Sequence, residues 1–149
     1  MKLLNYDIVF KEHPLHISLC LSISQCKFRC KNCHTPELQS DVGIKLSDSN
    51  FQTLLIKYQE YISNVIFMGG YEPNDYKEII KFLNICHTYN LKTTLWTGYD
   101  EVILEVLKYL DYLKTGRYIE EKGPLGSKNT NQKYIEVKTN KEIKINGNQ

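Results

Sequence analysis

The sequence predicts an α/β fold with a mostly parallel, curved sheet, and three observations support this prediction. Strand-like and helix-like patterns alternate at least three times along the chain, which favours parallel strands joined by right-handed helical crossovers. One strongly alternating strand runs directly into a cysteine-rich loop, and α/β folds place their chemistry beyond the C-terminal ends of such strands. At 149 residues the chain is shorter than a complete eight-fold TIM barrel, which typically needs about 250. We therefore expect a partial, incomplete barrel, formed by residues 1–149 as a single domain and closed by a C-terminal hairpin.

Composition excludes several classes of protein. Hydrophobic residues make up 42% and charged residues 24% of the chain, close to the average of globular domains. No apolar run approaches the roughly 18–20 residues needed to cross a bilayer, and the first 14 residues lack the apolar core of a signal peptide. The net charge of +2 is too weak for a general nucleic-acid or membrane-binding surface. We expect a cytoplasmic protein that binds neither nucleic acid nor membrane.

The first strand is predicted over residues 15–24, where large apolar residues occupy one parity and small polar residues the other. The small polar face suits a sheet surface that lines a cavity. Beyond the cysteine loop, Ser47 or Ser49 is placed to cap a helix. The apolar positions of this helix follow helical spacing: Phe51, Leu54, Leu55, Tyr58 and Ile62.

A second strand is predicted over residues 65–68, a short apolar run that ends at Gly69 and Gly70. Pro73 suits the first turn of the next helix, because its fixed backbone angle is compatible with helix and its missing N–H is not needed there. The apolar stripe of this helix has five members: Tyr76, Ile79, Ile80, Leu83 and Cys86.

The remaining strands are predicted over residues 92–97 and 112–115. Asp100 can cap the helix between them. The apolar face of that helix comprises Ile103, Val106, Leu107 and Leu110. Residues 121–133 then form a long loop without apolar periodicity, and loops of this length are usually functional or disordered. Residues 134–145 are expected to form the closing hairpin.

Three of the five cysteines lie within eight residues, in the arrangement C-x3-C-x2-C: Cys26, Cys30 and Cys33. In a reducing compartment such a group more often holds metal than disulfides. Three thiolates can ligate three irons of a 4Fe-4S cluster, which leaves the fourth iron open to another ligand. Cys20 is a poor fourth ligand, because an extended strand places it roughly 20 Å from Cys26.

The alternative metal is zinc, held by Cys26, Cys30, Cys33 and His34 as a Cys3His site. Adjacent cysteine and histidine are unlike the gapped ligand pairs of structural zinc sites, and the chain has no second CxxC or HxxxH pair. The spacing therefore favours iron-sulfur, and zinc remains as the alternative.

The cysteine spacing directly after a first strand resembles the signature of radical S-adenosylmethionine enzymes. Within that superfamily, CKFRCKNCHTPEL, IFMGGYEP, LWTGY and LGSKNTNQKYIEV are similar to segments of the activating proteins of anaerobic (class III) ribonucleotide reductase. One departure is Asn32, which stands before the third cysteine where the superfamily often has an aromatic residue. The resemblance covers nearly the whole chain, and it implies an incomplete TIM-like barrel of the radical S-adenosylmethionine type.

The resemblance implies a 4Fe-4S cluster on Cys26, Cys30 and Cys33 and S-adenosylmethionine bound at the fourth iron. It implies cleavage of S-adenosylmethionine and formation of a glycyl radical on the anaerobic reductase, with reduced flavodoxin or ferredoxin as electron donor. The cofactor supplies the chemistry, so no catalytic side chain is assigned. The implied contacts to S-adenosylmethionine are Asn32, Cys33, His34, Gly69, Gly70, Glu72 and Thr97.

Glu72 departs from the family pattern, because Tyr71 separates it from the two glycines. Related enzymes have an acidic residue directly after the glycines. Glu72 is therefore either a partner of the ligand's ammonium group or an ordinary carboxylate in the first turn of a helix.

The sequence also leaves alternatives for the partner protein and for the function. An activase of another glycyl-radical enzyme, such as pyruvate formate-lyase, and a zinc-binding interaction domain are the alternatives. The long loop, with Lys122, Lys128 and Lys133, is the candidate surface for docking a reductase. The cysteine loop itself is basic, with Lys27 and Arg29 among its charged residues.

Overall fold

The computed structural model describes residues 1–145, which form one eight-stranded sheet with helices packed on it. The order of strands across the sheet is β3-β1-β2-β4-β5-β6-β7-β8. The strands are β1 (Lys2–Val9), β2 (Ser18–Ile23), β3 (Ile44–Lys45), β4 (Asn64–Gly69), β5 (Lys92–Trp96), β6 (Tyr112–Thr115), β7 (Lys133–Glu136) and β8 (Lys141–Glu142). The α-helices are α1 (Asp48–Tyr58), α2 (Tyr76–Thr88) and α3 (Leu104–Leu107), and the 3-10 turns are η1 (Pro36–Gln39), η2 (Pro73–Asp75) and η3 (Glu120–Lys122).

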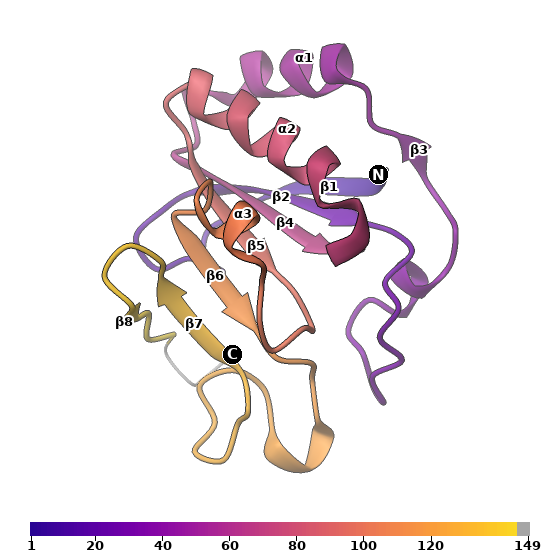
Figure 1. Cartoon of the computed structure of the whole chain (residues 1–149), viewed down its shortest axis with the longest axis vertical. Helices are drawn as coiled ribbons and strands as arrows, with labels where there is room; N and C mark the ends of the chain where they lie inside the picture. Colours follow the sequence, from indigo (N-terminus) through magenta and orange to yellow (C-terminus); the bar gives the residue numbers. More distant parts are fainter. Residues whose placement is uncertain (146–149) are drawn as a thin grey trace.

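The sheet is mixed, and the predicted fold class is therefore wrong. Strands β2, β4, β5 and β6 are parallel, but β1 and β3 pair antiparallel on one side and β7 and β8 on the other. The result is a single open arrangement with β3 and β8 at its edges (Figure 1). It is not part of a TIM-like barrel, because a barrel fragment would continue with parallel strands where β1 and β7 lie antiparallel.

Strand β1 is the longest strand that sequence periodicity missed; the two-residue strand β3 was missed as well. Asn5 and Asp7 fall in the middle of β1 and are exposed, so its apolar residues form no regular alternation. The strand forms through long-range pairing, since Ile8 lies opposite Leu19 and Tyr6 opposite Leu21 of the buried strand β2. Tertiary pairing overrides weak local preference here.

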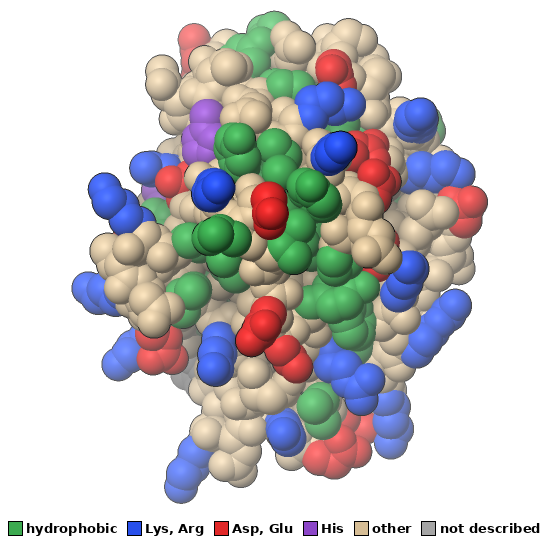
Figure 2. All heavy atoms as spheres, in the orientation of Figure 1, with side chains coloured by type: hydrophobic (Ala, Val, Ile, Leu, Met, Phe, Trp, Pro, Cys, Tyr) green, Lys and Arg blue, Asp and Glu red, His purple; other side chains and the backbone are tan. Residues whose placement is uncertain are grey.

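Helices α1 and α2 lie side by side over one face of the sheet, and α3 packs next to α2 (Figure 1). Ser47 caps α1, because its hydroxyl accepts a hydrogen bond from the Asn50 N–H at 3.1 Å. The core between helices and sheet combines apolar residues of the helices with one parity of the central strands, including Leu19 and Phe51, and it also contains Phe82, which the predicted stripe of the second helix omitted. Figure 2 views this helix-covered face, where hydrophobic side chains gather near the centre, over the region of α2 and α3.

The other parity of the strands forms a second, polar and aromatic face. Asn64 is fully buried; its amide donates to the Ser18 hydroxyl at 3.0 Å and its carbonyl oxygen accepts from Thr94 at 2.8 Å. The ring of His13 covers this face and lies 4.1 Å from the Tyr112 ring, centroid to centroid. Both faces of the central strands are therefore packed, which explains why every residue of β2 is buried.

Two further expectations can be compared with the described residues. Pro73 lies in the separate turn η2 in front of α2, and α3 begins after Ile103, later than the predicted cap at Asp100. No helix within residues 1–145 combines the length and the apolar character that a bilayer span needs.

Candidate functional site

The cysteine loop leaves the C-terminal end of β2 and is held by backbone hydrogen bonds. The Cys26 N–H donates to the Leu38 carbonyl at 2.8 Å, and the Cys33 N–H donates to the Cys30 carbonyl at 3.3 Å. Asn32 adopts a left-handed conformation with φ of 55°, which asparagine tolerates better than most residues. The loop thus turns tightly between the second and the third cysteine.

Cys26, Cys30 and Cys33 are half-buried and line one cavity of about 540 Å³. The cavity lies where β4, β5 and β6 end, and the segment after β6 forms its far wall. Its volume falls within the about 300–1,000 Å³ of typical small-molecule sites. Parallel strand ends therefore carry the site, as expected for an α/β arrangement.

The other two cysteines lie apart from this cavity. Cys20 and Cys86 are both buried. Burial raises the pKa of the Cys20 thiol to about 12 and that of Cys86 above its ordinary value. Both thiols are packed in the core away from the other three cysteines, and buried cysteines of this kind are unreactive structural residues.

Lys114 brings a positive charge to the largely apolar cavity. Its ammonium nitrogen lies 4.8 Å from the centroid of the Trp96 ring. Burial lowers the pKa of Lys114 to about 8, and the nearby Cys30 thiol opposes this shift. Lys114 and Trp96 both line the cavity, so an anionic group there would meet a half-buried cation.

Gly69 and Gly70 allow the end of β4 to press against the end of β2. The Gly70 N–H donates to the Ile23 carbonyl at 2.9 Å. A Cβ on Gly69 would overlap the Ile23 carbonyl oxygen, and one on Gly70 would overlap the Ser24 carbonyl oxygen. The two glycines thus fix the backbone directly beneath the cysteine loop, a role that needs no ligand. Of these two glycines, Gly69 lines the cysteine cavity and Gly70 does not.

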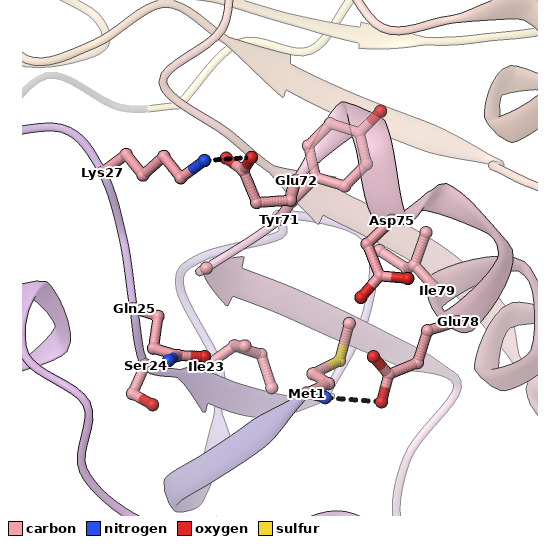
Figure 3. Close-up of a pocket in the computed structure, with 11 residues that line it drawn as sticks. Met1, Ile23, Ser24, Gln25, Lys27, Tyr71, Glu72, Asp75, Glu78 and Ile79 are labelled. Carbon is pink, nitrogen blue, oxygen red and sulfur yellow. Dashed lines mark hydrogen bonds and ion pairs between the residues drawn. The ribbon is translucent and has the colours of Figure 1, made fainter.

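Glu72 lines a second, smaller cavity of about 220 Å³ (Figure 3). Gly70 lines this cavity too. One carboxylate oxygen of Glu72 accepts from the Lys27 ammonium at 2.6 Å, and the other accepts from the Tyr99 hydroxyl at 2.8 Å. Burial alone would raise the pKa of Glu72, but the bonds from Lys27 and Tyr99 and the charge of Lys27 lower it overall.

The remaining predicted residues lie around the loop. Thr97 is 5% exposed and lines the cysteine cavity, as does His34. The Asn32 amide donates to the Glu120 carboxylate of η3 and does not line the cavity. Glu120 also pairs with Lys31 at 3.1 Å. Lys31 and Lys27 of the basic loop are thus both engaged by carboxylates of this chain.

The structure therefore gathers part of the predicted set around one cavity and leaves three members outside it. Those inside are Cys26, Cys30, Cys33, His34, Gly69 and Thr97. Asn32, Gly70 and Glu72 do not line this cavity. Sequence reasoning missed Lys114, although the alternation of the predicted strand 112–115 places it on the face opposite the core residue Leu113. It also missed Tyr99, whose role depends on contacts that no spacing reveals.

The cysteines fit an iron-sulfur cluster in kind and number, because thiolates are the usual ligands of iron-sulfur clusters. Within residues 1–145, no three His, Cys, Asp or Glu side chains already converge as a metal site. The segment with the cysteines has no regular secondary structure. Its sulfur atoms can therefore converge as a cluster binds, since metal binding and the ordering of ligands are coupled.

Comparison with known proteins agrees with this donor set. A family model described as a 4Fe-4S single cluster domain matches residues 17–143, which include the cysteine loop and strands β2 to β8. Comparisons with curated proteins and with solved structures give no significant match. Because the family model covers most of the chain, a 4Fe-4S cluster-binding domain is present, and the chain belongs to the 4Fe-4S single cluster domain family.

Proposed function

We propose that the chain is a radical S-adenosylmethionine activase that generates a glycyl radical on an anaerobic ribonucleotide reductase. The observation that carries this proposal is the cavity lined by Cys26, Cys30 and Cys33. With three cysteine ligands one iron keeps an open position. The motifs that resemble the activating proteins of the reductase support the choice of substrate.

When bound on Cys26, Cys30 and Cys33, the cluster with S-adenosylmethionine would supply the chemistry, namely one-electron reductive cleavage of S-adenosylmethionine and removal of a hydrogen atom from a glycine Cα of the partner. Reduced flavodoxin or ferredoxin is the proposed source of that electron. The chain itself contributes ligands, position and exclusion of water.

The cavity residues have distinct proposed roles. Cys26, Cys30 and Cys33 hold the cluster. His34, Gly69 and Thr97 line the same cavity as the thiols and are the proposed contacts to S-adenosylmethionine. The apolar lining limits water near the reacting atoms. Asn32, Gly70 and Glu72 lie outside this cavity, so no contact to the ligand is assigned to them here.

The test of this function is anaerobic reconstitution with iron and sulfide, followed by reduction in the presence of S-adenosylmethionine. We expect 5′-deoxyadenosine and methionine in equal amounts. Alanine at any one of the three loop cysteines should abolish both products. Cys86→Ala is the matched control and should retain them, because Cys86 is a core residue of α2. Turnover that survives the loss of a loop cysteine would contradict the ligand assignment.

The partner is tested separately by electron paramagnetic resonance. Mixing the reconstituted and reduced protein with S-adenosylmethionine and an anaerobic ribonucleotide reductase should produce a glycyl radical signal on the reductase. A signal that forms only on pyruvate formate-lyase would keep the chemistry and replace the proposed partner.

A further inference from the structure

Tyr99 lies where the cysteine loop meets the turns after β4 and β5. Its hydroxyl donates to one oxygen of Glu72 at 2.8 Å. Its ring contacts the Phe28 ring edge-on, with centroids 4.8 Å apart and an interplanar angle of 78°. The Tyr99 carbonyl accepts from the Gly116 N–H, at the end of β6, at 3.0 Å. Tyr99 therefore joins segments that are far apart in the sequence.

Glu72 connects Tyr99 to the cysteine loop a second time. Its other oxygen pairs with Lys27, the residue directly after Cys26 (Figure 3). The Lys27 side chain is 66% exposed, and such an exposed ion pair alone contributes little. The Tyr99 hydroxyl, however, holds one Glu72 oxygen and so leaves the other directed at Lys27. Hydrogen bonds to charged groups are stronger than neutral ones.

Phe28 supplies the other connection. It lies between Cys26 and Cys30 in the sequence, and its ring occupies the space next to Gly98, where a Cβ would come within 2.6 Å of the ring. Phe28 also lines the cysteine cavity. Tyr99 therefore contacts the first half of the cysteine loop through a ring contact at Phe28 and through Glu72 at Lys27.

We propose that Tyr99 is a positioning residue that fixes Cys26 and Cys30 at the cavity by acting through Glu72 and Phe28. The inference rests on the proposed role of these cysteines as cluster ligands. It gives Glu72 a function within this chain, since both carboxylate oxygens already have partners. Positioning of ligands by surrounding contacts is a general requirement of metal sites.

Tyr99→Phe tests the hydroxyl, because it removes one oxygen and keeps the ring. The reconstituted proteins are exposed to a ferrous chelator, and the rate of iron release is measured. We expect release to be about tenfold faster in Tyr99→Phe, a ratio that corresponds to about 1.4 kcal/mol. Glu72→Gln should show a similar increase. The double variant should be no faster than the faster single variant, because both changes break the same connection.

Two matched controls separate positioning from general damage. The Tyr71 ring lies 6.0 Å from Tyr99, centroid to centroid, and its buried hydroxyl has no partner among the described residues, so Tyr71→Phe should leave iron release unchanged. Glu78 lines the same small cavity as Glu72 but pairs with the Met1 amine. Glu78→Gln should therefore also leave the rate of iron release unchanged. The thermal midpoint of the apoprotein should stay within about 2 °C in Tyr99→Phe, a small shift for a chain of this size.

The spectrum of the reduced cluster gives a second measurement, because a displaced ligand changes its electron paramagnetic resonance line positions. Wild-type release rates and an unchanged spectrum in Tyr99→Phe would overturn the proposal. A lowered apoprotein midpoint with proportionate iron loss would also overturn it and leave a purely structural role. Failure to form 5′-deoxyadenosine in the wild type, with the expected release pattern intact, would refute the proposed function and not this inference.

Discussion

Gly98→Ala is expected to displace the cysteine loop through a single added methyl group. The new Cβ would lie 2.6 Å from Cδ2 and 2.8 Å from Cγ and Cε2 of Phe28, whereas carbon atoms in contact are about 3.5–4.0 Å apart. The whole ring must therefore move by roughly 1 Å. Gly98 has no positive φ, so the alanine backbone is unstrained and the effect is one of space alone. Overpacking of this kind costs about 1–3 kcal/mol.

The assay is urea unfolding of the apoprotein, combined with the iron content after reconstitution. Gly98→Ala should lower the free energy of unfolding by about 1–3 kcal/mol and reduce the iron incorporated, because Phe28 lies between two ligand cysteines. The same substitution in a Phe28→Ala background should cost less than about 0.5 kcal/mol, the usual margin for uncoupled sites. An equal cost in both backgrounds would refute the assigned contact.

Three further predictions concern the fold around the site. Burial, reinforced by the charge of His16, lowers the pKa of His13 from 6.5 to about 4; the unfolded chain therefore binds a proton that the native state excludes between these values. Stability falls as the pH drops through this window, and from pH 7 to pH 4.5 the wild type should lose about 2–3 kcal/mol more than His13→Phe in urea titrations. Gly70→Ala should fail to give folded protein or unfold at much lower urea, since its Cβ meets backbone at Ser24 that cannot turn aside; a wild-type midpoint would contradict the close strand contact. Asn64→Leu should cost about 2–4 kcal/mol in the same assay, because two buried hydroxyls lose their partner, and a loss below about 0.5 kcal/mol would argue against that network.

Local patterns account for the elements at the centre of the fold. The alternation in Ser18–Ile23, the apolar run before Gly69 and the stripe in Tyr76–Thr88 correspond to β2, β4 and α2, because each of these segments has the apolar periodicity or run length of its element. The predicted barrel is wrong because the curvature of a sheet depends on which strands join its edges. That choice is made by long-range pairing of β1 and β7, which local periodicity does not encode.

The candidate site is likewise predictable from the sequence only in part. The spacing of Cys26, Cys30 and Cys33 is sufficient to predict a shared cavity, because ligands close in sequence on one loop are also close in space. The place of Glu72 is not predictable from spacing, since it depends on contacts to Lys27 and Tyr99 from two other segments. From the sequence, with Tyr71 between it and the two glycines, Glu72 is either a partner of the ligand's ammonium group or an ordinary carboxylate in the first turn of a helix.

The central claim is an open iron in a three-cysteine cluster, and electron paramagnetic resonance of the reduced, reconstituted protein tests it most directly. The spectrum is recorded before and after addition of S-adenosylmethionine, with Cys86→Ala as a control that keeps all three ligands. The account predicts that S-adenosylmethionine shifts the signal of the 4Fe-4S cluster in both proteins, because the ligand binds the open iron. A cluster signal that S-adenosylmethionine leaves unchanged would contradict the account.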